Sequence, residues 1–116
     1  MSDYTTLGQL EQAHNEAVRA AKVRIEHAEE FIHSYRTQMY RMQEDFYALA
    51  TREGVAEAPE FREELHRVSD RIEENVHGAA QVLAGFEEEL ATVRMQYSEE
   101  REELLWRHRT NSDDSR

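Results

Sequence analysis

Histidines that follow a glutamate by three residues are the feature of this sequence whose spacing could do chemistry. Four of the six histidines stand in such pairs. The pairs are Glu11 and His14, Glu30 and His33, Glu63 and His66, and Glu74 and His77. On a helix this spacing places both side chains on one side of one turn, which is how ferritin-like bundles hold two metal ions.

Surface contacts within a helix explain these pairs better than a metal centre does. Metal ligands must point inward from facing helices, whereas the four pairs are scattered along the chain and only His14 falls on an apolar stripe. With 25 Asp and Glu in 116 residues, neighbours three apart on a helix surface are expected from composition alone. We therefore predict no metal site and no cofactor, and keep a metal-binding bundle as a minor alternative.

Other catalytic signatures are missing from the sequence. The chain has no cysteine, so it offers no thiol nucleophile, disulfide or Cys-ligated metal. It has no Gly-rich phosphate loop, and its serines are not placed with His or Asp by any recognisable motif. We expect that the protein is not an enzyme.

Composition and charge narrow the class of partner. The net charge of −11 repels phosphates, so nucleic acid and anionic membrane surfaces are poor candidates. No run of about 18 apolar residues exists, so we expect no membrane insertion. The start, MSDYTTLGQLEQ, lacks the basic and apolar segments of a secretory signal peptide.

Apolar residues recur at steps of three and four in both halves of the chain, which predicts two long amphipathic helices. The first stripe comprises Leu7, Leu10, His14, Val18, Ala21, Ile25, Ala28, Ile32, Tyr35, Met39, Met42, Phe46 and Leu49. The second comprises Phe61, Leu65, Val68, Ile72, Val76, Ala79, Leu83, Phe86, Leu90, Val93, Tyr97, Glu100 and Leu104. Two successive steps of four at Ile72 and Val76, just before Gly78, predict a local unwinding or bend there but no break.

One turn separates the two stripes. Gly54 suits the left-handed position after a helix end, and Pro59, the only proline, suits the first turn of the next helix. We predict a single all-α domain over residues 1–116, a long antiparallel two-helix hairpin resembling a coiled coil. Its predicted parts are a helix over about 5–52, a turn at 53–58, a helix over about 59–109 and a disordered tail at 110–116.

Details of the two ends follow from the same pattern. Thr5 or Thr6 could cap the first helix. The stripes predict that Leu49 meets Phe61 at the turn, and that Leu7 lies near Leu104 at the open end. His14 and Glu100 fall at similar heights, so either they touch or the open end is loosely packed.

Several large apolar residues fall off the stripes, and a hairpin with one seam cannot bury them. They are Phe31, Tyr40, Tyr47, Val82, Leu105 and Trp106. Scattered exposure of such residues is normal, but a thin core favours contact with further helices. Our predicted partner-binding residues are Phe31, Tyr40, Tyr47, Val82 and Trp106.

An acidic, Cys-free helical hairpin of this length resembles the small helical proteins of bacterial type VII secretion. The WXG (ESAT-like) members carry Trp-x-Gly in the turn, where this chain reads TREGVAEAP, with Gly54 and no Trp. They often end in Tyr-x-x-x-Asp/Glu, whereas Tyr97 is followed four residues later by Arg101. Both WXG signatures are absent.

A second group, the LXG-associated helical proteins, is similar in the segment FEEELATVRMQYSEEREELLWRHR. This resemblance implies a non-catalytic adaptor or chaperone that binds the helical N-terminal domain of an LXG-type effector and targets it for type VII secretion. It implies a cytoplasmic protein, with co-export left open, that forms a heteromeric bundle with the effector or with another small helical protein. The alternative is a homodimeric coiled-coil adaptor or structural protein unrelated to secretion.

Overall fold

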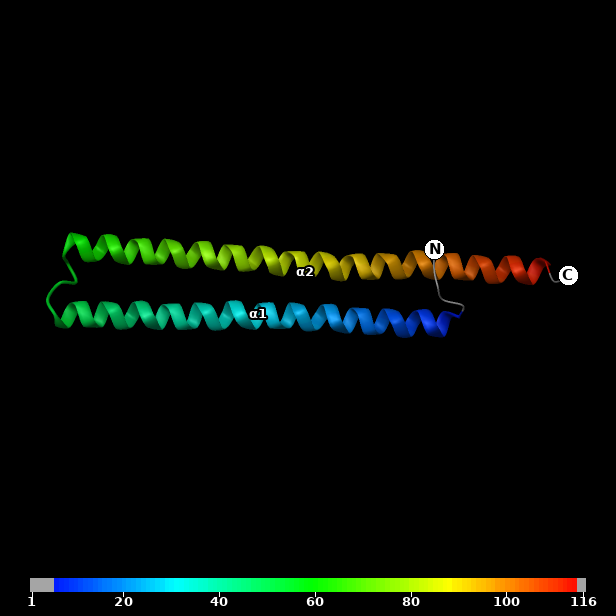
Figure 1. Ribbon diagram of the computed structural model, residues 1–116, viewed down its shortest axis with the longest axis horizontal. Coiled ribbons are helices and arrows are strands. Elements are labelled where there is room, and N and C mark those ends of the chain that lie inside the picture. The colour runs from blue at the N-terminus through cyan, green and yellow to red at the C-terminus, as the bar shows by residue number, and fades with distance from the viewer. Residues whose placement is uncertain (1–5, 115–116) are drawn as a thin grey trace. The chain divides into compact units, whose positions relative to one another are not determined.

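The computed structural model describes residues 6–114, with side chains described for residues 6–111. Helix α1 spans Leu7–Arg52 and helix α2 spans Pro59–Asp114, and no strand occurs among the described residues (Figure 1). The all-α prediction of two helices joined by one turn is confirmed.

The chain divides into two compact units. The turn unit is Glu26–Ala84, and the end unit is Met1–Ile25 with Gly85–Arg116. In the turn unit Gln43 bonds to Ser69 and Tyr35 to Asn75, so α2 numbers rise as α1 numbers fall. In the end unit His14 contacts Tyr97 and Arg24 contacts Glu89 in the same sense. The helices are therefore antiparallel within each unit, whereas one domain over residues 1–116 stays a prediction.

Thr6 is the residue that caps α1. Its hydroxyl Oγ1 accepts the backbone N–H of Gln9 at 3.1 Å, and its carbonyl accepts that of Leu10. A hydroxyl cap of this kind stabilises a helix by about 1 kcal/mol. Of the two predicted caps Thr6 is thus confirmed, and Thr5 lies outside the described residues.

The turn closes α1 through a glycine-based hydrogen-bond pattern. Gly54 has a φ of 76°, the left-handed conformation that the sequence predicts. The Val55 N–H donates to the Ala50 carbonyl at 2.8 Å, and the Gly54 N–H donates to the Thr51 carbonyl at 3.1 Å. This pair of bonds is the Schellman motif, which satisfies carbonyls that the helix end would leave free.

Helix α2 begins at its proline, as predicted. Pro59 is the first helical residue, where the missing N–H would have no partner within the helix. The first backbone bond of α2 runs from the Arg62 N–H to the Ala58 carbonyl at 3.1 Å.

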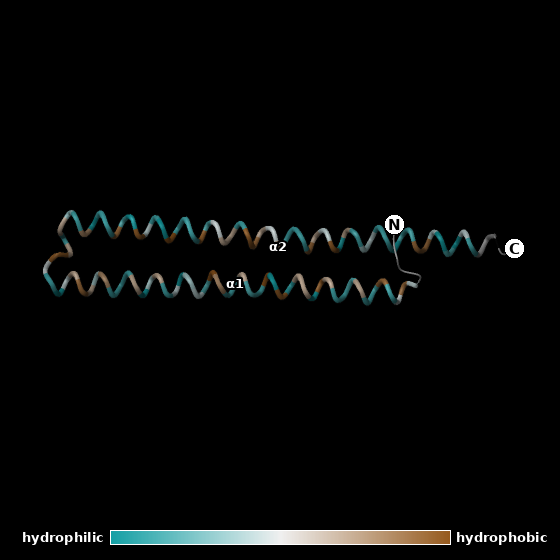
Figure 2. The backbone as a smooth tube through the Cα atoms, in the orientation of Figure 1, coloured by the Kyte–Doolittle hydropathy of each residue, from teal (hydrophilic) through white to brown (hydrophobic). Residues whose placement is uncertain are grey.

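Both stripes supply the core, which is thin. The buried apolar residues in the described part of the chain are Leu10, Ala21, Ala50, Ile72, Val76 and Leu104. Most other stripe residues are half-buried, and apolar segments recur along both helices between hydrophilic ones (Figure 2). Ile72 and Val76 are both buried within an unbroken helix, so the double step of four does not interrupt α2 near Gly78.

The stripe prediction is wrong at the last turn of α1. Leu49 is 45% exposed and Phe46 is 50% exposed, whereas the neighbouring Ala50 is 4% exposed. Ala50 follows Phe46 by four residues. Leu49 points about 100° away from Ala50 around the helix axis. Ala50, not Leu49, therefore occupies the buried position next to the turn.

The predicted disordered tail is also wrong over most of its length. Helix α2 continues to Asp114, five residues beyond the expected end near residue 109. No Gly or Pro occurs there to stop the helix, and extending a formed helix is easy because the nucleation cost is already met. The Thr110 hydroxyl donates to the Trp106 carbonyl at 3.0 Å in this segment. Residues 115 and 116 lie outside the described residues.

Candidate protein-interaction surface

Two exposed tyrosines frame a groove in the turn unit. Tyr40 is 54% exposed and Tyr47 is 50% exposed, and they lie seven residues apart on one face of α1. Between them is a hollow of about 490 Å³, which we name the tyrosine groove. Its lining residues are Tyr40, Gln43, Glu44, Tyr47 and Ala48 of α1 with Leu65 and Ser69 of α2.

The spacing of the α1 residues in this groove suits an incoming helix. Tyr40, Gln43, Glu44 and Tyr47 stand at positions i, i+3, i+4 and i+7, which form the four corners of a hole for one side chain of a facing helix. Tyrosine offers a large, rigid contact area with a polar tip, so it tolerates exposure and also binds well.

Polar contacts between α1 and α2 hold the groove in place. The Gln43 amide Nε2 donates to the Ser69 hydroxyl Oγ at 2.6 Å, and both residues line the groove. Further from the turn, the Asn75 amide Nδ2 donates to the Tyr35 hydroxyl at 2.8 Å. Bonds of this kind stabilise by about 1 kcal/mol each, and together they fix the register of the two helices beside the groove.

The other predicted partner-binding residues are exposed but separate from the groove. In the turn unit Phe31 is 63% exposed and Val82 is 55% exposed, and the Phe31 ring stacks on Tyr35 with centroids 6.2 Å apart. Trp106, 61% exposed, belongs to the end unit. Leu105, which the sequence placed off the seam, is half-buried.

The sequence did not predict the exposure of five apolar residues, of which Val23 and Met95 belong to the end unit and three lie close to the turn. Phe46 and Leu49 sit on the predicted stripe, and Val55 in the turn is 45% exposed. The spacing could not have moved the seam from Leu49 to Ala50, because these residues follow Phe46 by three and four positions and both steps fit a helical stripe.

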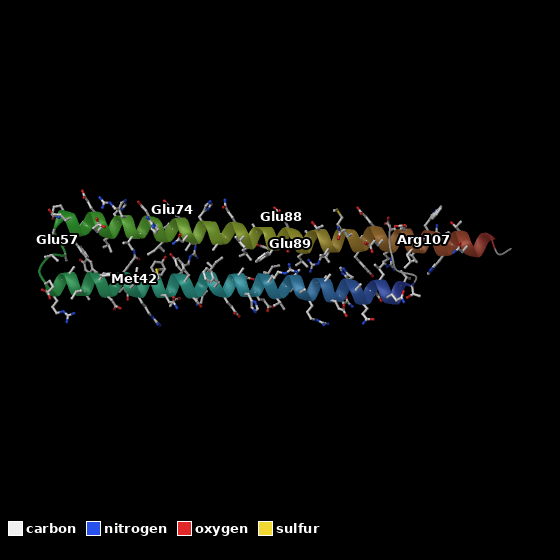
Figure 3. All side chains as sticks on the ribbon, in the orientation of Figure 1. Met42, Glu57, Glu74, Glu88, Glu89 and Arg107 are labelled. Carbon is white, nitrogen blue, oxygen red and sulfur yellow. The ribbon has the colours of Figure 1, made fainter. Side chains whose placement is uncertain are left out.

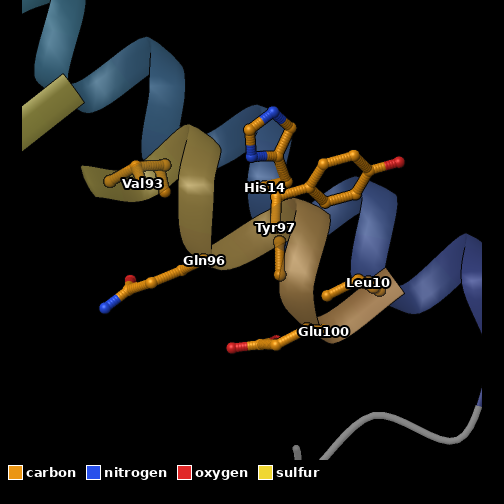
Figure 4. A pocket seen from close by; sticks show the side chains of 8 residues that line it. Leu10, His14, Val93, Gln96, Tyr97 and Glu100 are labelled. Atoms are coloured by element: carbon orange, nitrogen blue, oxygen red, sulfur yellow. The ribbon is translucent and has the colours of Figure 1, made fainter. Parts of the chain in front are cut away.

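A small pocket in the end unit brings His14 and Tyr97 together (Figure 4). Their rings stack with centroids 4.1 Å apart and an interplanar angle of 21°. Glu100 lines the same pocket of about 110 Å³, and the His14 Nδ1 atom is buried without a hydrogen-bond partner. The sequence left open whether His14 touches Glu100 or the open end is loosely packed. The structure stacks His14 on Tyr97 and places Glu100 in the lining of the same pocket.

The Glu-x-x-His pairs do not converge. His66 lies 3.7 Å from Asp70 rather than on Glu63, which contacts Arg67 at 4.0 Å. His77 lies 3.4 Å from Gln81, and Glu74 projects from the side of α2 turned away from α1 (Figure 3). Within residues 6–111, no three His, Asp or Glu side chains gather in a geometry that could hold a metal ion.

Negative charge is concentrated in the turn unit. That unit contains six Arg and thirteen Asp or Glu, a balance of −7, against −4 for the end unit. Two of its six arginines are already engaged by nearby carboxylates, since Arg62 lies 3.6 Å from Glu57 and Arg67 lies 4.0 Å from Glu63. A binding surface here therefore presents carboxylates in excess to an approaching partner.

Comparisons with known proteins give no indication of the function. The chain matches no protein-family model, no curated protein and no solved structure. Neither described helix contains a stretch long and apolar enough to cross a membrane.

Proposed function

We propose that this protein is a non-catalytic helical adaptor that binds helices of another protein through the tyrosine groove. The observation that carries the proposal is the exposure of Tyr40 and Tyr47 on either side of a hollow built from both helices. Large aromatic side chains around a preformed hollow are typical of the few residues that dominate binding energy at protein interfaces.

The groove suits one mode of recognition. An amphipathic partner helix lays its apolar face along α1, and one of its side chains enters the hole between Tyr40 and Tyr47. The Gln43–Ser69 bond keeps the hole open before the partner arrives, which lowers the entropy cost of binding. Excess carboxylates in the turn unit favour a helix whose apolar face is bordered by Lys or Arg.

We further propose that the client is the helical N-terminal domain of an LXG-type effector, which the adaptor targets to type VII secretion. The support for this finer proposal is the likeness of the α2 segment FEEELATVRMQYSEEREELLWRHR to LXG-associated helical proteins. A hairpin with a thin core and exposed aromatic residues is also suited to completing its packing against a client.

Co-expression with an LXG N-terminal domain tests the proposal. We expect a stable complex in size-exclusion chromatography, and at least a tenfold rise in Kd for the Tyr40→Ala, Tyr47→Ala double variant. Met95→Ala is the matched control, because Met95 is 58% exposed but lies in the end unit. Equal losses of affinity in both variants would exclude the tyrosine groove as the docking site.

Different outcomes contradict the proposed identity of the client and the proposed role of the tyrosine groove. If no LXG domain binds, but an unrelated helical protein binds in a manner that depends on Tyr40 and Tyr47, the secretion role is wrong and the adaptor remains. If neither binds, the adaptor proposal itself is wrong.

A further inference from the structure

A second apolar groove lies on the other flank of α1 in the turn unit. It is a hollow of about 400 Å³, which we name the Phe46 groove. Its lining residues are Gln38, Arg41, Met42, Asp45, Phe46 and Leu49. It shares no residue with the tyrosine groove, and Met42 and Tyr47 point about 140° apart around the helix axis.

The Phe46 groove consists of two consecutive holes of the kind that receive helix side chains. Gln38, Arg41, Met42 and Asp45 form one hole, at positions i, i+3, i+4 and i+7. Met42, Asp45, Phe46 and Leu49 form the next, one turn closer to the end of α1.

Apolar lining, rather than spacing, distinguishes this groove. A hollow near the start of α1 has the same spacing, but its lining residues are Gly8, Glu11, Gln12, Asn15, Glu16 and Arg19. Such a polar hollow gains little from being covered. In the Phe46 groove, by contrast, Phe46 is 50% exposed and Leu49 is 45% exposed, so an occupant would remove large apolar side chains from water.

The charges of the Phe46 groove are balanced and unused. Arg41 and Asp45 are one turn apart and carry opposite charges, within a unit whose balance is −7. Neither makes an ion pair with another residue in the described part of the chain. A cation followed one turn later by an anion is a pattern that a second, antiparallel copy of the same helix complements reciprocally.

We propose that the Phe46 groove is where a second copy of this chain docks, antiparallel about a two-fold axis near residues 43 and 44. In that register Phe46 of one copy is level with the hole formed by Gln38, Arg41, Met42 and Asp45 of the other. Met42 is at the same time level with the second hole. Because the axis makes each contact twice, four side chains fill four holes.

Charge complementarity favours this occupant over an unrelated helix. In the same register Arg41 of each copy lies within about two residues of Asp45 of the other, so two cross-copy ion pairs form together. A second copy does not need Lys or Arg beside its apolar face, because the charges of Arg41 and Asp45 cancel in the lining of the Phe46 groove. The tyrosine groove differs, since Glu44 is its one charged lining residue.

Removing the apolar anchor is the first test. Sedimentation equilibrium of the full chain should show a reversible dimer at micromolar concentration, and Phe46→Glu should raise its Kd by at least about 30-fold. Because Phe46 is half-exposed, the variant should keep its helical circular dichroism. Tyr47→Ala, which alters only the tyrosine groove, should leave the dimer unchanged and so separates this inference from the adaptor proposal.

A charge exchange tests the partner's identity. Arg41→Asp and Asp45→Arg should each weaken self-association about tenfold, since each sets like charges opposite each other. An equimolar mixture of these two variants should restore it to within about threefold of the wild type, because both cross-copy pairs are again of opposite sign. Only a contact between Arg41 and Asp45 of different copies predicts this recovery.

Three results would overturn the inference. The first is a wild-type chain that stays monomeric even at about 100-fold above micromolar concentration. The second is a Phe46→Glu variant that dimerises as tightly as the wild type. The third is a mixture of Arg41→Asp and Asp45→Arg that associates no better than either variant alone. Self-association abolished by Tyr47→Ala rather than by Phe46→Glu would place the dimer contact in the tyrosine groove and equally contradict it.

Discussion

Single residues determine where α1 stops and how its exposed face is arranged. Gly54 adopts the left-handed conformation that lets Val55 reach back to Ala50. Next to that closure Ala50 is 4% exposed, whereas Leu49 is 45% exposed and Phe46 is 50% exposed. Gln43, by bonding to Ser69, links α1 to α2 within the lining of the tyrosine groove. Local contacts thus end α1, and a contact between the helices supports the tyrosine groove.

Replacing Gly54 tests whether the end of α1 requires a residue that adopts the left-handed conformation. Gly54→Ala should lower the free energy of unfolding by about 1–2 kcal/mol, because a side chain is strained at a φ of 76°. Urea unfolding followed by circular dichroism measures the change. Gly85→Ala should instead stabilise by up to about 1 kcal/mol, since Gly85 is helical and nothing lies within 4 Å of an added Cβ. A loss of stability in both variants, or a gain in both, would contradict this expectation.

The two helices are held together by their apolar seam more than by charge. The cross-helix pair of Arg24 with Glu89 spans 3.3 Å, but both side chains are about half exposed. Exposed pairs of this kind contribute about 0–1 kcal/mol. Burying a leucine contributes about 1.5–3 kcal/mol, so residues such as Leu104, 1% exposed, decide how α1 and α2 pair in each unit.

Shortening Leu104 tests the seam at the element scale. Leu104→Ala should destabilise the chain by about 2–4 kcal/mol, from lost burial and from the cavity left behind. Met95→Ala on the same helix should change stability by less than about 0.5 kcal/mol, because Met95 is 58% exposed. Thermal and urea unfolding measure both, and a small loss for Leu104→Ala would mean that the end unit is not held by its seam.

At the scale of the whole molecule, charge distinguishes the two proposed partners. The net charge of −11 opposes association of two copies in general, and it favours a basic client. We therefore expect self-association only at a surface whose charges cancel. A basic client, by contrast, is attracted by the acidic rest of the surface. The Phe46 groove and the tyrosine groove differ in this respect, because Arg41 and Asp45 line the first, and Glu44 is the one charged residue of the second.

Salt should separate the two associations. Raising NaCl from 50 to 500 mM should weaken client binding about tenfold or more, because added ions screen attraction between an acidic adaptor and a basic client. Dimerisation should change by much less than client binding, because salt screens both the repulsion between two chains of charge −11 and the attraction in the cross-copy Arg41–Asp45 pairs. Titrations at both salt concentrations measure the two effects, and an opposite ordering would rule out this division of roles.

Periodicity and turn chemistry by themselves determined the two helices, a threonine cap at residue 5 or 6, the left-handed Gly54 and the start at Pro59. They could do so because each follows from contacts within a few residues of the chain. The exposure of Tyr40, Tyr47, Phe31, Val82 and Trp106 was predictable because these residues fall off the two apolar stripes.

Packing between helices decided what the sequence could not. A helical wheel does not tell which of two adjacent residues, Leu49 or Ala50, closes the seam beside the turn. Nor does it tell that the His14 ring stacks on Tyr97. Whether an apolar residue near the edge of a stripe is buried depends on the rotation of one helix against the other. That rotation is set by contacts between residues far apart in sequence, such as Gln43 and Ser69.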